Sequence, residues 1–184
     1  MDPRLPKRLD AMFRAFRAGN PGDLKRIGYD AIGDAALQND HDLASLSVIA
    51  YSLYKIITRA HFMENPRWQW VSETISSSLE RSFGAAERLD HKGFHKNMKS
   101  IIGKIQGIDN ELSNYARNVY EKAKIKQAST AYAMGLSLKQ AAELTQADPK
   151  ELQKYIGITR IHDEQPGGIG ISERLRAFKE ALGK

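Results

Sequence analysis

Basic side chains recur at helical spacing in residues 91–104. Lys92, Lys96 and Lys99 stand at i, i+4 and i+7, and His95 lies beside them. Residues at these separations share one face of an α-helix, and no acidic residue occurs between positions 91 and 108. A stripe of one sign can bind phosphates through charge alone, without reading a base sequence. An ordinary solvated helix face is the simpler interpretation of the same residues, and both interpretations stay open.

His91 and His95 are four residues apart, a spacing that would place two imidazoles on one helix face for a metal ion. The zinc-protease version of this pair has a glutamate directly after the first histidine as general base. Lys92 occupies that position, and the sequence offers no obvious third ligand nearby. We therefore expect no metal and no other cofactor.

Arg88 and His95 have six residues between them. This spacing resembles the arginine–histidine signature of HEPN ribonucleases, which are also helical bundles. The resemblance implies that the pair would polarise a scissile phosphate and assist proton transfer from the 2′-hydroxyl. Such a pair also arises by chance in a chain with 28 lysines and arginines. The sequence contains no glycine-rich phosphate loop, nucleophile elbow or acidic metal cluster, so we predict no catalytic residues and keep the ribonuclease as an alternative.

A second set of polar side chains lies in residues 136–158. Ser137 is a good N-cap for a short helix, and Asp148 followed by Pro149 is a good start for the next one. This order predicts a helix-turn-helix. The turn usually holds a glycine, whereas this chain has Gln146 there.

The predicted second helix has two distinct sides. Leu152, Tyr155 and Ile156 stand at i, i+3 and i+4 and should pack inward, which leaves Lys150, Gln153 and Lys154 on the outer side. In DNA-binding proteins of this kind, the outer side enters the major groove. Asp148 and Glu151 add negative charge where phosphates would approach, so a structural corner or a protein-docking module is the alternative.

Residues 137–157, SLKQAAELTQADPKELQKYIG, resemble the helix-turn-helix of small antitoxin-like proteins encoded beside PIN-domain ribonucleases, especially in archaea. The similarity extends less clearly to Glu164 and covers about a fifth of the chain. It implies a regulator or a partner that neutralises a toxin. PIN nucleases hold Mg²⁺ in a ring of carboxylates, and Arg160, Arg174 or Arg176 would take the place of that metal by bidentate pairing.

The C-terminal tail has the composition of a linker followed by a helix. Residues 163–170, DEQPGGIG, resist regular structure because they are rich in glycine and proline. Ser172 then caps a predicted mobile helix with Leu175, Phe178 and Leu182 along one side. We predict that Phe178 and the tail arginines contact a partner. Docking of this helix on the chain's own bundle is the alternative.

The elements that must position these residues are all predicted to be helices. The expected starts are Leu5, the Asn20-Pro21 pair, Asp40 or Asp42, the Asn65-Pro66 pair and Asp109, where the last begins a long helix that reaches Met134. The third helix is apolar nearly all round and should be the centre of a bundle. The fold class is therefore all-α. The predicted division is a helical bundle over 1–106, a long helix with the helix-turn-helix over 107–162, and the linker and terminal helix over 163–184.

Bulk composition narrows the classes of function. Hydrophobic residues make up 41% and charged residues 27%, which is typical of a soluble globular protein. The chain has no cysteine, no apolar run near 18 residues and no apolar region of a signal peptide, so we expect a cytoplasmic protein without a membrane span. The net charge of +6 favours anionic partners.

Together these features predict a non-enzymatic regulator or antitoxin-like protein. Its expected partners are a PIN-type nuclease, duplex DNA or RNA, and a second copy of the chain in a homodimer. A HEPN-like helical ribonuclease and a general nucleic-acid-binding module remain the alternative functions.

Overall fold

The computed structural model describes the backbone of residues 1–111 and 119–163 and the side chains of 1–107 and 119–158. Within these ranges the chain forms nine α-helices and no strand, which confirms the predicted all-α class. The helices are α1 (Leu5–Arg17), α2 (Pro21–Gln38), α3 (His41–Ile57), α4 (Ala60–Met63), α5 (Trp68–Glu87), α6 (His91–Glu111), α7 (Val119–Ala133), α8 (Leu138–Thr145) and α9 (Pro149–Asp163).

Capping side chains set several of the helix starts. The Asn20 side chain accepts a hydrogen bond from the backbone N–H of Asp23 (3.1 Å), and Asp40 Oδ1 accepts from Asp42 and Leu43 (2.8 and 2.9 Å). Both caps lie where the sequence predicts them. The Asn65-Pro66 signal is displaced, because Asn65 caps a turn that precedes Trp68, where α5 begins.

The expected helix start at Asp109 is wrong, because α6 continues through this residue to Glu111. Gly103 and Gly107 lie within α6, and each costs only about 1 kcal/mol relative to alanine. That cost is too small to end a helix whose Phe94, Met98 and Ile105 are buried in the core. The helix expected to reach Met134 is α7, which begins at Val119 and ends at Ala133.

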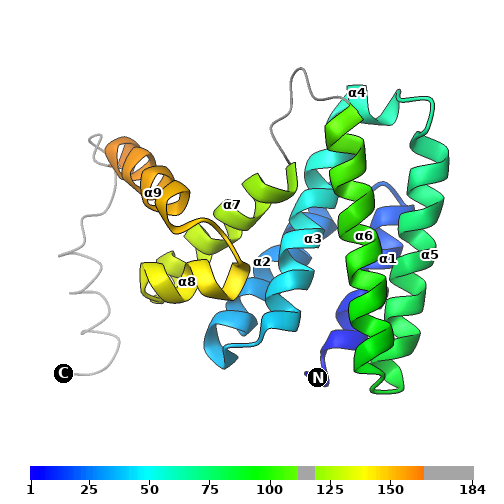
Figure 1. Ribbon diagram of the computed structural model, residues 1–184, viewed down its shortest axis with the longest axis horizontal. Coiled ribbons are helices and arrows are strands. Elements are labelled where there is room, and N and C mark those ends of the chain that lie inside the picture. Colours follow the sequence, from blue (N-terminus) through cyan, green and yellow to red (C-terminus); the bar gives the residue numbers. More distant parts are fainter. Residues whose placement is uncertain (112–118, 164–184) are drawn as a thin grey trace.

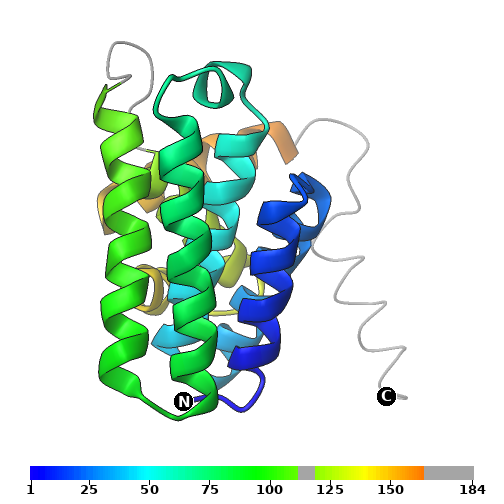
Figure 2. The ribbon, with the colours of Figure 1, turned by 90° about the vertical axis from the view of Figure 1, so that its right-hand side faces the viewer.

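Helix α3 lies at the centre of the molecule, as its apolar sequence predicts. Figure 1 shows α7, α8 and α9 on one side of α2 and α3, and α1, α5 and α6 on the other. In Figure 2, α1, α5 and α6 run lengthwise beside one another. Leu43, Leu46, Ile49, Leu53 and Ile56 of α3 are completely buried. The same hydrophobic cluster includes residues from α1 through α9, so α7–α9 share their core with the N-terminal helices.

Helices α2 and α3 approach closely at Gly28. Ser47 Oγ donates a buried hydrogen bond of 2.7 Å to the carbonyl oxygen of Gly28. A Cβ added to Gly28 would lie only 3.2 Å from the Ser47 carbonyl oxygen. The close approach fixes α3, and with it the surface on which α7 packs. None of the helices in the described ranges is long and apolar enough to cross a membrane.

Candidate functional site

The corner between α8 and α9 is built by local hydrogen bonds. Ser137 Oγ accepts from the backbone N–H of Gln140 (3.2 Å), and Gln140 Oε1 accepts from the backbone N–H of Ser137 (3.0 Å), which forms a capping box at the start of α8. Asp148 Oδ1 accepts from the N–H groups of Lys150 and Glu151 (2.8 and 3.0 Å) at the start of α9. The two helices are therefore separated by residues 146–148 alone.

Gln146 takes the conformation for which glycine is usually chosen. Its φ is +56°, in the left-handed region, and its N–H donates to the carbonyl oxygen of Glu143 (3.2 Å). Ala147 then donates to Ala142 (3.0 Å), so the carbonyl groups of Ala142 and Glu143 near the end of α8 are satisfied. The absence of glycine does not prevent the turn.

The inner side of the corner belongs to the core, and its outer side is polar. Leu152 and Ile156 are buried, as predicted, and Tyr155 is half-buried. Lys150, Gln153 and Lys154 are exposed on α9. Buried contacts on one side of a helix hold the side chains on its other side in a defined register. The carboxylate of Asp148 is directed at the backbone N–H groups of the first turn of α9.

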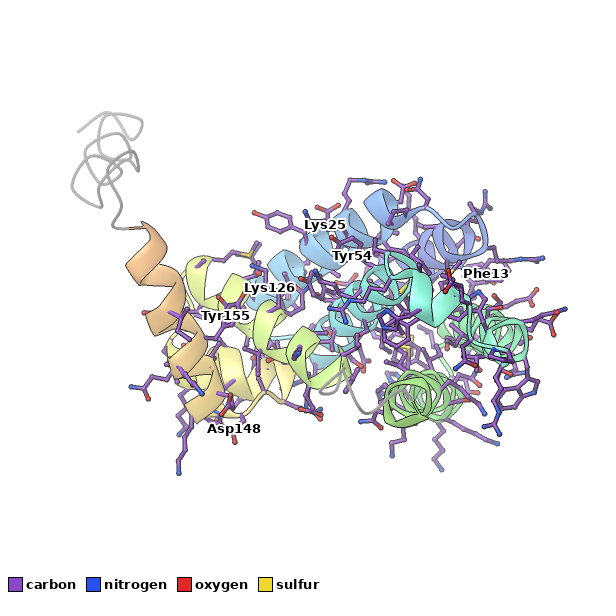
Figure 3. The ribbon with its side chains drawn as sticks, turned by 90° about the horizontal axis from the view of Figure 1, so that it is seen from above. Phe13, Lys25, Tyr54, Lys126, Asp148 and Tyr155 are labelled. Atoms are coloured by element: carbon purple, nitrogen blue, oxygen red, sulfur yellow. The ribbon has the colours of Figure 1, made fainter. Side chains whose placement is uncertain are left out.

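A cleft of about 420 Å³ lies next to this corner, between the C-terminal part of α3, α7 and α9. Figure 3 shows two of its lining residues, Lys126 on α7 and Tyr155 on α9. Five cationic residues line the cleft, and they are Lys55, Arg59, Lys122, Lys126 and Lys154. Lys154 is the one that the sequence singled out. The sequence does not single out the other four, but it carries a signal for them: Tyr51, Lys55 and Arg59 recur at four-residue intervals, as do Lys122 and Lys126.

Two tyrosines line the same cleft. Burial raises the pKa of Tyr51 to about 12, and the neighbouring Tyr155 adds to this effect. The Tyr51 phenol therefore stays neutral at physiological pH and can donate a hydrogen bond. Lys55 Nζ lies 5.4 Å from the centroid of the Tyr51 ring and 5.0 Å from that of Tyr54. These aromatic rings hold the Lys55 ammonium group at the edge of the cleft.

The basic stripe on α6 is present, and α3 modifies it. Lys92, Lys96 and Lys99 are exposed along the helix, as their spacing predicts. His95 is also exposed, but its Nε2 lies 2.7 Å from Asp42 Oδ1 on α3. An acidic group that is distant in the sequence therefore interrupts the stripe. Lys104, the last basic residue of 91–104, does not extend the stripe, because its Nζ lies 3.9 Å from the centroid of the Trp70 ring.

The contact between His95 and Asp42 affects both the metal-binding pair, His91 and His95, and the ribonuclease pair, Arg88 and His95. His95 bonds to Asp42, while His91 is exposed, and no group of three or more metal-ligating side chains occurs in the part of the chain that the structure describes. Arg88 follows the last residue of α5, and its guanidinium lies back over Gly84, where an added Cβ would be 3.4 Å from Nη1. The two residues of the predicted ribonuclease pair therefore have different neighbours: Arg88 lies over Gly84, and His95 contacts Asp42.

The predicted partner-binding residues lie outside the described side chains. They are Arg160, Arg174, Arg176 and Phe178, and the linker over 163–170 lies almost wholly in the same undescribed part of the chain. Their contact with a partner stays a prediction. So does the division of the chain at residues 106 and 162.

No model of a known protein family matches this chain, and neither a curated protein nor a solved structure was found to be similar to it.

Proposed function

We propose that this chain is a non-enzymatic regulator that binds duplex DNA through the outer side of α9. The observation that carries the proposal is the placement of Lys150, Gln153 and Lys154, which are exposed on a helix whose opposite side is buried in the core. A helix held in this way presents its polar side chains as a rigid set, as the recognition helix of a helix-turn-helix does.

The three side chains suit different parts of a duplex. The carboxamide of Gln153 can donate to and accept from the edge of an adenine, which gives base preference. Lys150 and Lys154 suit phosphates, because an ammonium group is a point charge that needs no fixed geometry. The net charge of +6 favours the approach to any duplex. The proposed roles therefore separate sequence preference from general affinity.

The test compares variants in a duplex-binding titration by fluorescence anisotropy at several salt concentrations. Gln153→Ala should reduce the preference for a selected sequence over a scrambled one by about 1–3 kcal/mol. Lys150→Ala and Lys154→Ala should weaken both duplexes alike, and each should lower the salt slope by about 1. Lys25→Ala is the matched control, because Lys25 is an exposed lysine on α2. Absence of duplex binding at low salt would show that the corner docks protein instead.

The proposal includes a protein partner of the PIN-nuclease type, which rests on the resemblance of residues 137–157 to antitoxin-like proteins. We expect truncation after Glu164 to abolish binding to such a nuclease and to leave the melting temperature unchanged. Arg174→Glu should weaken the complex, while Lys179→Glu, a matched charge reversal in the same segment, should weaken it less. Size-exclusion chromatography of each variant mixed with the nuclease measures complex formation, and thermal denaturation measures the melting temperature of the truncated chain. A fall of many degrees in the melting temperature would show that the tail belongs to the core.

A ribonuclease is the alternative that the same preparation can test. The contact with Asp42 engages the Nε2 atom of His95 and leaves only its Nδ1 atom for proton transfer. We expect no cleavage of single-stranded RNA by the purified chain. Cleavage that disappears in His95→Ala but persists in His91→Ala would overturn the non-enzymatic proposal.

A further inference from the structure

The cleft between α3, α7 and α9 has the size of a small-molecule site. Its volume of about 420 Å³ lies within the range of about 300–1,000 Å³ that ligand pockets usually occupy. Its walls come from three separate helices, of which α3 is the buried centre of the fold. The site is therefore formed by the tertiary structure, and its main walls are already in place without a ligand.

The charges around the cleft are unbalanced. Glu151 is the one acidic residue among the described residues that line it, against five cations. In the described parts of the chain, Lys122, Lys126 and Lys154 form no ion pair, whereas Lys124 and Lys139 pair with Glu121 (2.5 Å) and Glu143 (3.8 Å). Other exposed lysines of the described residues, such as Lys25 and Lys150, also lack an ion pair, but the lysines of the cleft are gathered around one hollow. Neighbouring cations repel one another, so an anion bound between them would be stabilised.

The rest of the lining suits a flat organic group. Tyr51 and Tyr155 contribute aromatic surface, and Val119, Ala123, Ile125 and Ile158 contribute aliphatic surface. Aromatic side chains stack on nucleobases with little dependence on base identity. A fatty-acid carboxylate would neutralise a single cation, whereas a diphosphate or triphosphate can contact several of them at once.

We propose that this cleft binds a nucleoside di- or triphosphate, with the phosphates held by Lys55, Lys122 and Lys126 and the base packed against Tyr155. Arg59 lies after the end of α3 and extends the phosphate-binding side. Lys154 contributes from α9, so a bound nucleotide would touch the helix proposed to contact DNA. The nucleotide site itself does not depend on DNA binding.

The test is an isothermal titration of the full chain with ADP. We expect binding that Lys122→Glu weakens by at least about tenfold, since a charged hydrogen bond is worth about 1.5–3 kcal/mol. Lys25→Glu is the matched control, because both lysines are exposed, and it should leave ADP binding unchanged. AMP and inorganic pyrophosphate should each bind more weakly than ADP, because one lacks a phosphate and the other lacks the base. No heat with either ADP or GDP would overturn the proposal, as would tighter binding of decanoate.

A second measurement does not depend on a variant that folds. Addition of ADP to ¹⁵N-labelled protein should shift the amide signals of Ala123, Ile125 and Tyr155, which line the cleft. Shifts confined to residues 92–99 would place the anion on the α6 stripe and would contradict the proposal. Loss of duplex-DNA binding in Lys126→Gln, together with no response to ADP, would show that the cleft is part of the DNA-binding surface. Failure of DNA binding with intact ADP binding would overturn the proposed function alone.

Discussion

At the scale of single residues, a side chain's role depends on what distant helices bring to it. The sequence places His95 in a basic stripe, but Asp42 of α3 is its actual neighbour. Asp42 and His95 are 53 positions apart, and local spacing carries no information about such a pair. By contrast, the exposure of Lys150 and Gln153 could be predicted, because helical periodicity alone decides which side of α9 is buried.

The left-handed backbone of Gln146 leads to a prediction about stability. Because a Cβ in this region costs about 1–2 kcal/mol, Gln146→Gly should stabilise the fold by about 1 kcal/mol and raise the melting temperature. The Gln146 side chain is exposed, so replacing it by glycine removes no buried side-chain packing. Ser77→Gly, at an exposed position inside α5, is the control and should lower the melting temperature instead. An equal fall in both variants would refute the strain argument.

Asp2 gives a prediction about pH. A side-chain hydrogen bond from Arg4 holds the pKa of Asp2 below its ordinary value, and Arg4 Nη2 lies 2.9 Å from Asp2 Oδ2. Because the folded-state pKa is lowered, this contribution to stability is complete above the unfolded pKa, at about 4, and is lost as the pH falls through the folded pKa. Asp2→Asn should therefore lower the melting temperature at pH 7, and the difference from wild type should shrink below about pH 4.

The control for this titration is Asp10→Asn, which removes a partly exposed carboxylate that pairs with the exposed Arg14 on the same helix. Exposed pairs contribute little to stability, so this variant should melt close to the wild-type protein at both pH values. A difference for Asp2→Asn that does not change with pH would mean that the lost interaction is not one of charge.

At the scale of whole elements, capping residues predict where helices begin better than glycines predict where helices end. The caps at Asn20, Asp40, Ser137 and Asp148 are where the sequence predicts them, because each depends on a side chain bonding to its own first turn. The sequence predicts a new helix at Asp109, two residues after Gly107, yet α6 continues through both residues. A glycine weakens a helix by an amount that tertiary burial readily exceeds, so its effect cannot be judged from the local sequence.

The cap at Asp148 can be tested by its removal. Asp148→Ala leaves the N–H groups of Lys150 and Glu151 without their acceptor and should cost about 1 kcal/mol of unfolding free energy. Urea denaturation measures the loss. Glu80→Ala, at an exposed position in the interior of α5, should change stability by much less. If the two variants are equally stable, the start of α9 is held by its buried Leu152 and Ile156, and the cap contributes little.

At the scale of the whole molecule, the cleft could not be predicted because it belongs to no single segment. Tyr51 and Lys55 recur on one side of α3, and Lys122 and Lys126 on one side of α7, so each half is visible in the sequence. That the two sides meet depends on the packing of α7 against α3 and of α9 against α7. The outer surface of α9 and the cleft then share Lys154.

This shared lysine predicts that the two proposed sites are coupled. Saturating ADP should weaken duplex-DNA binding several-fold, because its phosphates would neutralise Lys154 and bring negative charge close to α9. By thermodynamic linkage, the duplex must weaken ADP binding by the same factor. Anisotropy titrations with and without ADP measure the first factor, and calorimetry with and without duplex measures the second.

The control for this coupling is Lys122→Glu, which is expected to bind ADP at least about tenfold more weakly and to keep Lys154. At an ADP concentration that leaves this variant largely unliganded, its affinity for DNA should change little, because a ligand that is not bound cannot shift an equilibrium. Unequal factors in the wild-type protein would show that the two titrations do not report on the same pair of sites. If both ligands bind but neither changes the affinity for the other, Lys154 contacts only one of them. The cleft and the outer side of α9 would then act as separate surfaces.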